Sequence, residues 1–212
     1  MDVLGESKAL RIDVEDDLGQ KIGRLSPVTR SLVDDEALIE KFTQWRNKAR
    51  NHFLTQFTAT TDRTKNWLQE VILKDPTRLM LIIHSREEAI GHYGFKGLST
   101  DSVELDNLIR GEKGGHPQLI FYAERALLSW LFETFHVKKI YAYVLSHNFI
   151  ALQLHQALGF RVTELIPLEK VLQRDEIHLT MGQAGGKSSE GLYVQKVELE
   201  HENFVHRKGE AA

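Results

Sequence analysis

The sequence predicts a mixed α/β domain, and three observations support this fold class. Apolar residues recur at helical spacing in residues 34–48 and 62–74. Three runs of strand character follow: "RLMLIIH", "EAIGHYGF" and "SVELDNLI". The second half then gives a long apolar helix, the strand "KKIYAYVL", the helix "NFIALQLHQALG" and the strands "FRVTELIPL" and "DEIHLTMG". This order of elements is typical of one layered α/β core.

The predicted domain has extensions at both ends. Residues 1–24 are polar and weakly periodic, so they are interpreted as an irregular lead-in, and residues 25–181 form the domain. Residues 182–212 combine a linker, "GQAGGKSSEG", with a stretch that alternates enough to form an extra strand. That strand could dock on its own domain or on a second subunit, which leaves a homodimer open.

Composition excludes several classes of function. The chain has 212 residues, a net charge of -3 and no Cys, so disulfides, thiolate zinc sites and cysteine nucleophiles are excluded. No overall positive charge attracts the protein to nucleic acid or an anionic membrane. The sequence also has neither a signal-peptide pattern nor an apolar run of membrane-spanning length. We therefore expect a cytoplasmic protein with no nucleic-acid or membrane partner.

Two near matches to known motifs are rejected. "MGQAGGKS" has Met181 where a nucleotide-binding P-loop needs its first glycine, and poor helix-forming residues follow it. "HENFVH" places its histidines five residues apart, so on a helix they do not share the face that zinc binding requires. We expect no metal site.

The stretch "NLIRGEKGGHPQL" joins the third predicted strand to the long helix. Its glycines leave backbone N–H groups uncovered, and Pro117 suits the first turn of a helix. Free N–H groups, the positive end of the helix dipole and the charges of Arg110, Lys113 and His116 together favour a phosphate or pyrophosphate. The alternative is that these glycines only shape a tight turn.

A second motif decides between these interpretations. "NFIALQLHQALGF" places Asn148, Ala151, His155 and Gly159-Phe160 in the order NxxAxxxHxxxGF, directly after a strand. With the glycine turn upstream, residues 25–181 resemble the GNAT superfamily of acetyl-CoA-dependent N-acetyltransferases. The resemblance implies a single mixed sheet with helices on both faces and a splayed central pair of strands. A weaker similarity points to the branch found with nucleotide-sugar enzymes.

The resemblance implies that acetyl-CoA is the co-substrate. The amides of the turn would hold its pyrophosphate, and the backbone of the preceding strand would bind the pantetheine arm. Asn148 matches a family contact to that arm, although it could equally cap the following helix. The turn departs from the family pattern, because Gly111 stands at the usual Gln/Arg position and His116 at the final Gly/Ala. The implied cofactor-binding residues are Asn107, Leu108, Ile109, Arg110, Gly111, Glu112, Lys113, Gly114, Gly115, His116 and Asn148.

The same resemblance assigns catalytic candidates. The family's usual acid is a Tyr, and this chain has His155 there, which either protonates the leaving thiolate or only packs beside CoA. Glu104 and Asp106 lie two residues apart, hence on one face of a strand, and either could act as general base. The alternative for this pair is a solvated strand face. His92, on the neighbouring strand, is a third candidate base.

The acceptor is expected to be a small-molecule primary amine, with a nucleotide-linked amino sugar favoured. A protein or peptide acceptor stays open, as does a non-catalytic module that binds acyl-CoA or acts through its tail. The early helices form the acceptor side in this family, and their Arg46, Arg50, His52 and Arg63 suit an anionic acceptor as well as a solvated helix face.

Overall fold

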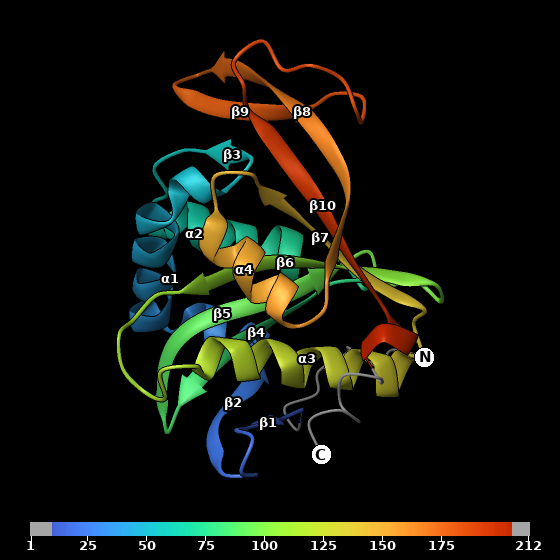
Figure 1. Cartoon of the computed structure of the whole chain (residues 1–212). Coiled ribbons are helices and arrows are strands. Elements are labelled where there is room, and N and C mark those ends of the chain that lie inside the picture. Colours follow the sequence, from blue (N-terminus) through green and yellow to red (C-terminus); the bar gives the residue numbers. More distant parts are fainter. Residues whose placement is uncertain (1–9, 205–212) are drawn as a thin grey trace. The chain divides into compact units, whose positions relative to one another are not determined.

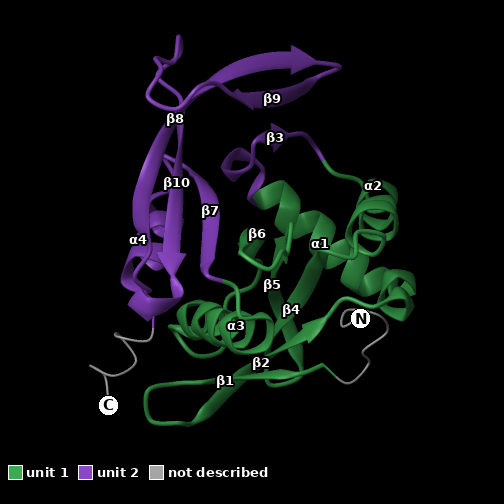
Figure 2. Ribbon diagram, turned by 90° about the vertical axis from the view of Figure 1, so that its right-hand side faces the viewer, with its two compact units in different colours: residues 1–48, 59–137 green, residues 49–58, 138–212 purple. Residues whose placement is uncertain are grey.

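The computed structural model describes residues 10–204 and divides the chain into two compact units. Unit 1 comprises residues 1–48 and 59–137, and unit 2 comprises residues 49–58 and 138–212 (Figure 2). Each unit combines antiparallel strands with helices, so the predicted α/β class is confirmed (Figure 1).

Unit 1 contains five described strands in the order β1-β2-β4-β5-β6, with each neighbouring pair antiparallel. The strands are β1 (Ile12–Glu15), β2 (Lys21–Pro27), β4 (Leu79–Ser85), β5 (Glu88–Lys96) and β6 (Ser102–Arg110). The helical elements are η1 (Arg30–Asp34), α1 (Glu36–Lys48), α2 (Thr61–Trp67), the π-helical turn η3 (Leu68–Ile72) and α3 (Leu119–Phe135).

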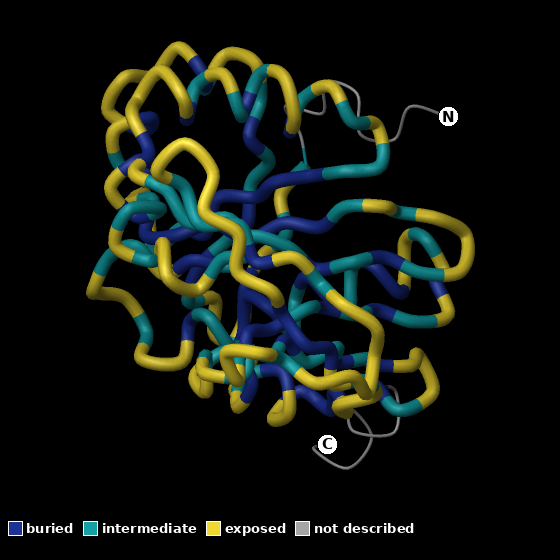
Figure 3. Tube along the Cα trace, turned by 90° about the horizontal axis from the view of Figure 1, so that it is seen from above, coloured by how far each residue is buried: buried dark blue, intermediate teal, exposed yellow. Residues whose placement is uncertain are grey.

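Helices pack on both faces of this sheet. On β5, the ring of His92 lies 4.9 Å from the ring of Phe42 on α1. Phe95, three residues further along the strand, lies 6.2 Å from the ring of Trp130 on α3. Side chains an odd number of positions apart on a strand point to opposite faces. The core of unit 1 therefore has two layers, one on each face of the sheet. Figure 3 shows which parts of the chain are buried.

The N-terminal hairpin corrects one expectation. Within residues 1–24, interpreted as an irregular lead-in, residues 10–24 contain β1 and most of β2, and residues 1–9 lie outside the described residues. Val14 and Leu25 are fully buried, and Asp17 at the hairpin tip accepts a hydrogen bond from Tyr122 of α3 at 2.9 Å. β1 has only four residues, so its alternation of apolar and charged side chains is too short to stand out in the sequence.

Unit 2 contains five described strands in the order β7-β10-β8-β9-β3, again antiparallel. They are β7 (Lys139–Leu145), β10 (Tyr193–Glu200), β8 (Arg161–Gln173), β9 (Glu176–Met181) and β3 (Thr55–Gln56), with the helical elements α4 (Phe149–Ala157) and η2 (Arg50–His52). A buried cluster that includes Leu145, Ile166 and Val194 joins β7, β8 and β10.

The extra strand expected near the C-terminus is β10, and it pairs with β7 and β8 of its own chain. The segment before it, interpreted from composition as a flexible linker, makes specific hydrogen bonds. The Ser188 hydroxyl donates to the Leu168 carbonyl at 3.0 Å and accepts from the Leu192 N–H at 3.0 Å. Composition alone did not reveal this anchoring serine.

The helices and the meander follow the predicted ranges closely. Asp35 accepts a hydrogen bond from the Leu38 N–H and so caps α1, and Thr60 caps α2 in the same way. The predicted strands 78–84, 88–95 and 102–109 correspond to β4, β5 and β6, with bounds that differ by at most one residue at each end. α4 ends before Gly159, whose φ of 102° places it in the left-handed region that favours glycine.

Candidate functional site

The glycine turn between β6 and α3 offers uncommitted backbone donors. The Gly111 and Glu112 N–H groups both donate to the Ile90 carbonyl, at 2.8 and 2.9 Å. Within the described part of the chain, four N–H groups of the turn donate no hydrogen bond. These belong to Lys113, Gly114, Gly115 and His116. Such a run of amides is suited to an anion.

Arg110 organises the same turn. Its guanidinium donates to three carbonyl oxygens of the turn, those of Glu112 at 3.3 Å, Gly114 at 2.9 Å and Pro117 at 3.3 Å. In a trans peptide the C=O and the following N–H point in opposite directions. Arg110 therefore turns the N–H groups of Lys113 and Gly115 away from its own side chain. It supplies charge as expected, and it also braces the loop.

The start of α3 differs from the expectation. The helix begins at Leu119, two residues beyond Pro117, so Pro117 precedes the first turn. The His116 carbonyl accepts from the Leu119 N–H at 3.0 Å, and the His116 Nδ1 atom accepts from the Gln118 N–H at 3.2 Å. His116 therefore occupies two donors at the helix start, and the open amides lie in the turn itself.

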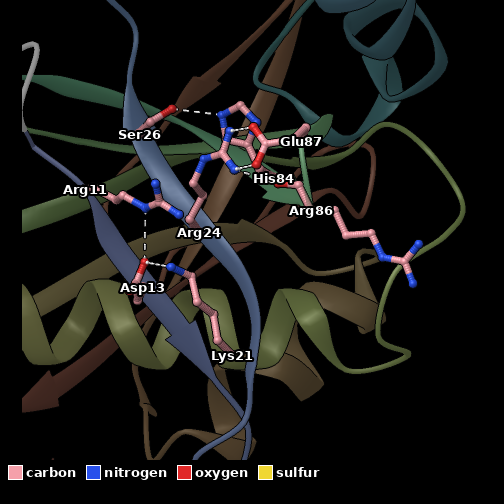
Figure 4. A network of polar contacts seen from close by, with 8 residues as sticks. All are labelled: Arg11, Asp13, Lys21, Arg24, Ser26, His84, Arg86 and Glu87. Atoms are coloured by element: carbon pink, nitrogen blue, oxygen red, sulfur yellow. Dashed lines mark hydrogen bonds and ion pairs between the residues drawn. The ribbon is translucent and has the colours of Figure 1, made fainter.

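The β4–β5 hairpin packs against the turn. A Cβ atom on Gly115 would lie 2.5 Å from the Ser85 Oγ atom, and its φ of 71° also favours glycine. Arg24 of β2 fixes this hairpin by donating to both carboxylate oxygens of Glu87, at 2.9 and 2.8 Å (Figure 4). Beside it, the Ser26 Oγ and His84 Nε2 atoms lie 2.8 Å apart. These contacts fix the β4–β5 hairpin, which packs against the turn.

A bulge in β6 lies where the pantetheine arm is expected. Asn107 has a φ of 57°, and the pairing register with β5 shifts between His92 and Gly94. The His92 Nδ1 atom lies 2.7 Å from the Asn107 carbonyl oxygen, so that nitrogen carries the proton and donates. The Leu108 N–H belongs to the same peptide unit and points away from His92.

His92 is poorly placed to act as a base. It is only 2% exposed, and burial lowers its pKa to about 4, which keeps the ring neutral at pH 7. Its Nδ1–H is already engaged. Its role in the structure is to fix the Asn107 carbonyl, which the sequence did not indicate.

Glu104 and Asp106 lie together on one face of β6, as predicted, and basic residues flank them. The Lys96 Nζ atom lies 3.0 Å from Glu104 and 3.7 Å from Asp106, and Arg78 lies 3.4 Å from Asp106. Burial raises the pKa of Glu104, although the ion pair with Lys96 opposes this. The pair is thus half-buried and ion-paired rather than a solvated strand face.

Arg46 adds positive charge close to Asp106, and Arg63 lies close to Arg46. Burial lowers the pKa of Arg46 to about 10, the charge of Arg63 lowers it further, and Asp106 opposes both. Arg78 also pairs with Asp75 at 3.4 Å. Lys96, Arg78 and Arg46 therefore all act on the charge of Glu104 or Asp106.

Asn148 and His155 lie in unit 2. The Asn148 side-chain oxygen accepts from the Ala151 N–H at 3.3 Å, so Asn148 caps α4. Among the described residues its side-chain NH₂ donates no hydrogen bond, which leaves it able to donate to a cofactor carbonyl. His155 is 4% exposed, and its ring lies 5.0 Å from the Phe160 ring. The acid role of His155 stays a prediction.

Sequence reasoning missed Lys96 and Arg78 beside the acids. A short loop joins β5 to β6, so the pairing of Lys96 with Glu104 could have been found by extending the hairpin register. The contact of Arg78 depends on the tertiary fold. Within residues 10–204, no three His, Asp or Glu side chains gather as a metal site would require, and no helix is long and apolar enough to cross a membrane.

An α/β fold with an amide-lined turn before a long helix is a feature of proteins that bind phosphorylated ligands. Residues 24–161 match the family model described as an acetyltransferase (GNAT) domain. The chain therefore belongs to the GNAT family of acetyltransferases. It is an N-acetyltransferase, and acetyl-CoA is its co-substrate.

Solved structures support the fold. The spermidine N-acetyltransferase from Vibrio cholerae, in complex with CoA and spermine, has a TM-score of 0.65 at 13% identity, covering 87% of this chain and 98% of that one. A probable GNAT acetyltransferase from Chromobacterium violaceum has a TM-score of 0.67 at 13% identity, covering 93% of this chain and 96% of that one. A ribosomal L7/L12 alpha-N-protein acetyltransferase in complex with CoA has a TM-score of 0.63 at 13% identity, covering 90% of this chain and 98% of that one. No curated protein sequence matches the chain.

The residues present suit acetyl-CoA. The turn supplies four open amides for a pyrophosphate, and no side chain lies within 4 Å of a Cβ position on Gly114, whose φ of 124° requires glycine. Acetyl-CoA supplies the activated acetyl thioester. The chain must bind the cofactor, accept a proton from the incoming ammonium and stabilise the oxyanion.

Proposed function

We propose that this enzyme transfers the acetyl group of acetyl-CoA to a primary amine on a small anionic acceptor, with a nucleotide-linked amino sugar as the favoured class. The observation that carries the proposal is the charge beside Glu104 and Asp106. Lys96, Arg78 and Arg46 already lie beside these carboxylates, so a polyamine would bring further positive charge next to three cations. An acceptor phosphate or carboxylate would gain charge-assisted hydrogen bonds.

In the proposed reaction, Glu104 takes the proton of the acceptor ammonium, directly or through a water molecule. Burial raises its pKa toward the range in which a carboxylate works as a base near neutral pH. The neutral amine then attacks the thioester carbonyl, the C–S bond breaks, and the nitrogen loses its second proton to solvent as the amide forms. The leaving thiolate takes up a proton. We assign that proton to His155, which matches the family's acid position.

The turn from Arg110 to His116 is proposed to hold the pyrophosphate. Asn107, Leu108 and Ile109 would present backbone groups to the pantetheine arm, and Asn148 would donate from its free NH₂ group. Support comes from the open amides of the turn and from the His92 hydrogen bond that fixes the Asn107 carbonyl.

An acceptor screen tests the proposal. Release of free CoA thiol is measured with acetyl-CoA and one of four acceptors: a nucleotide-linked amino sugar, the same sugar without the nucleotide, spermidine, or a short peptide with a free N-terminus. We expect kcat/KM to be at least about tenfold higher with the nucleotide-linked sugar than with the free sugar, as one charge-assisted hydrogen bond would give.

The other outcomes are distinct. The highest kcat/KM with the peptide would favour a protein or peptide acceptor, the second candidate. The highest value with spermidine would contradict the charge argument. Acetyl-CoA binding without thiol release from any acceptor would contradict the small anionic acceptor.

A further inference from the structure

A single indole ring contacts both Gly111 and Glu112 in the glycine turn. Trp45 of α1 is fully buried, and its Nε1–H donates to the Glu112 carboxylate at 2.8 Å. The face of the same ring lies against Gly111, because a Cβ atom there would lie 2.1 Å from the indole Cδ2 atom. No side chain at position 111 fits beneath the ring. Gly111, which departs from the family pattern, is thus explained by Trp45.

The indole has little freedom to move. Its ring centroid lies 5.5 Å from that of Phe42 and 6.1 Å from that of His92. The backbone of the two residues that the indole contacts is also fixed, because the Ile90 carbonyl accepts from the N–H groups of both Gly111 and Glu112. The direction of the Trp45 N–H is therefore set by the core, and so is the position of the carboxylate that it holds.

Glu112 is the one acidic residue in the turn, residues 110–118. Its neighbours in the turn are the open amides of Lys113, Gly114 and Gly115. A carboxylate that was free to rotate could accept from these amides itself, and its charge would repel an anion there. The hydrogen bond to Trp45 holds this charge on the α1 side of the turn.

We propose that Trp45 is a positioning residue for acetyl-CoA: its N–H holds the Glu112 carboxylate off the turn and so keeps the amides open for the pyrophosphate. This inference rests on the proposed pyrophosphate site. It adds that α1, on the acceptor side of the family fold, governs the affinity for the acetyl donor.

The test uses a matched pair of variants at position 112. Glu112→Asp keeps the charge on a side chain one methylene shorter, which cannot reach the indole N–H. Glu112→Gln removes the charge and keeps an acceptor oxygen. By isothermal titration with acetyl-CoA, we expect Glu112→Asp to raise Kd about five- to tenfold more than Glu112→Gln does, because only Asp keeps the charge beside the amides.

Trp45→Phe provides an independent test by rescue. It keeps a ring over Gly111 and removes the donor, so we expect KM for acetyl-CoA to rise about five- to tenfold with kcat changed less than about twofold. The double variant Trp45→Phe/Glu112→Gln should recover most of the lost affinity. Acetyl-pantetheine, a donor that lacks the pyrophosphate, should show a much smaller change in KM. Trp130→Phe on α3 is the matched control for the change of ring.

Two results would overturn the inference. One is an equal effect of Glu112→Asp and Glu112→Gln on Kd, since the charge would then be irrelevant. The other is a folded Trp45→Phe variant that Glu112→Gln does not rescue, which would make Trp45 purely structural. Failure of the pyrophosphate site itself is distinguishable, because Gly114→Asp would then leave the affinity of the parent protein for acetyl-CoA unchanged.

Discussion

Glu104 is the residue whose replacement tests the chemistry most directly. It should be ionised to accept a proton, so activity should fall as the pH falls through its raised pKa. We predict that Glu104→Gln lowers kcat by about 100-fold or more and removes this acidic limb from the pH–rate profile. If Asp106→Asn has this effect and Glu104→Gln does not, Asp106 is the base.

His92 predicts a dependence of stability on pH. Its pKa is about 4 in the folded protein, against about 6.5 when unfolded. Between these values the unfolded state binds the proton and the folded state does not, so stability falls as the pH falls from about 6.5 to about 4. The full effect is about 3 kcal/mol.

Urea denaturation of the parent and of His92→Gln, at several pH values from 7 to 4.5, measures this effect. We expect the variant to be less stable at pH 7, because it loses the His92 packing against α1. The gap between the two proteins should narrow toward low pH. A constant gap would mean that His92 titrates alike in the folded and unfolded states.

Among the elements, the bulge of β6 depends on a residue that tolerates positive φ. Asn107 adopts a φ of 57°, where a β-branched side chain is strained by about 1–2 kcal/mol. We predict that Asn107→Gly keeps the thermal midpoint within a few degrees, whereas Asn107→Val lowers both the midpoint and the affinity for acetyl-CoA. Equal behaviour of the two variants in thermal unfolding and titration would show that the bulge is not under conformational control.

The loop brace of Arg110 should act mainly on cofactor binding. Lys cannot reach three carbonyls with a planar fork, so we predict that Arg110→Lys raises KM for acetyl-CoA about five- to twentyfold with little change in kcat. Steady-state kinetics would check this. A fall in kcat at constant KM would instead place Arg110 in the chemical step.

Elements with strong local patterns could be predicted from the sequence. The apolar stripe of α3 and the alternation in β4 to β6 are local signals, and their ranges were close to those observed. β1 was missed because it has only four residues, and β2 was missed because Gly23 and Pro27 weaken its alternation. The contact of the Trp45 ring with Gly111 was missed because the two residues lie 66 positions apart in the chain, and a local sequence pattern does not indicate such a contact.

At the scale of the whole molecule, the C-terminal strand should be essential for folding. β10 pairs with β7 on one side and β8 on the other, so its removal takes the middle strand out of their sheet. We predict that a chain ending at Gly191 is insoluble or lacks a cooperative thermal transition, whereas a chain ending at Phe204 keeps the parent transition. A soluble, cooperative protein ending at Gly191 would contradict this.

The fold class of the whole molecule could be predicted from the sequence, but its division into two compact units could not. The order of helices and strands, with the two motifs, was enough to identify the GNAT family. The position of β10 could not be predicted, because β7 and β10 are separated by two other strands and a helix in the sequence. The assignment of residues 25–181 as the acetyltransferase domain stays a prediction.

This strand order also bears on misfolding. β7 and β8 become neighbours of a common strand only when β10 arrives between them, and until then each presents an unpaired edge. Closing such distant pairs is slow, and open edges recruit other chains. Refolding yield should therefore fall steeply as protein concentration rises. A separate peptide with the β10 sequence, supplied during refolding, should compete for the position between β7 and β8 and leave unit 2 with a foreign strand there.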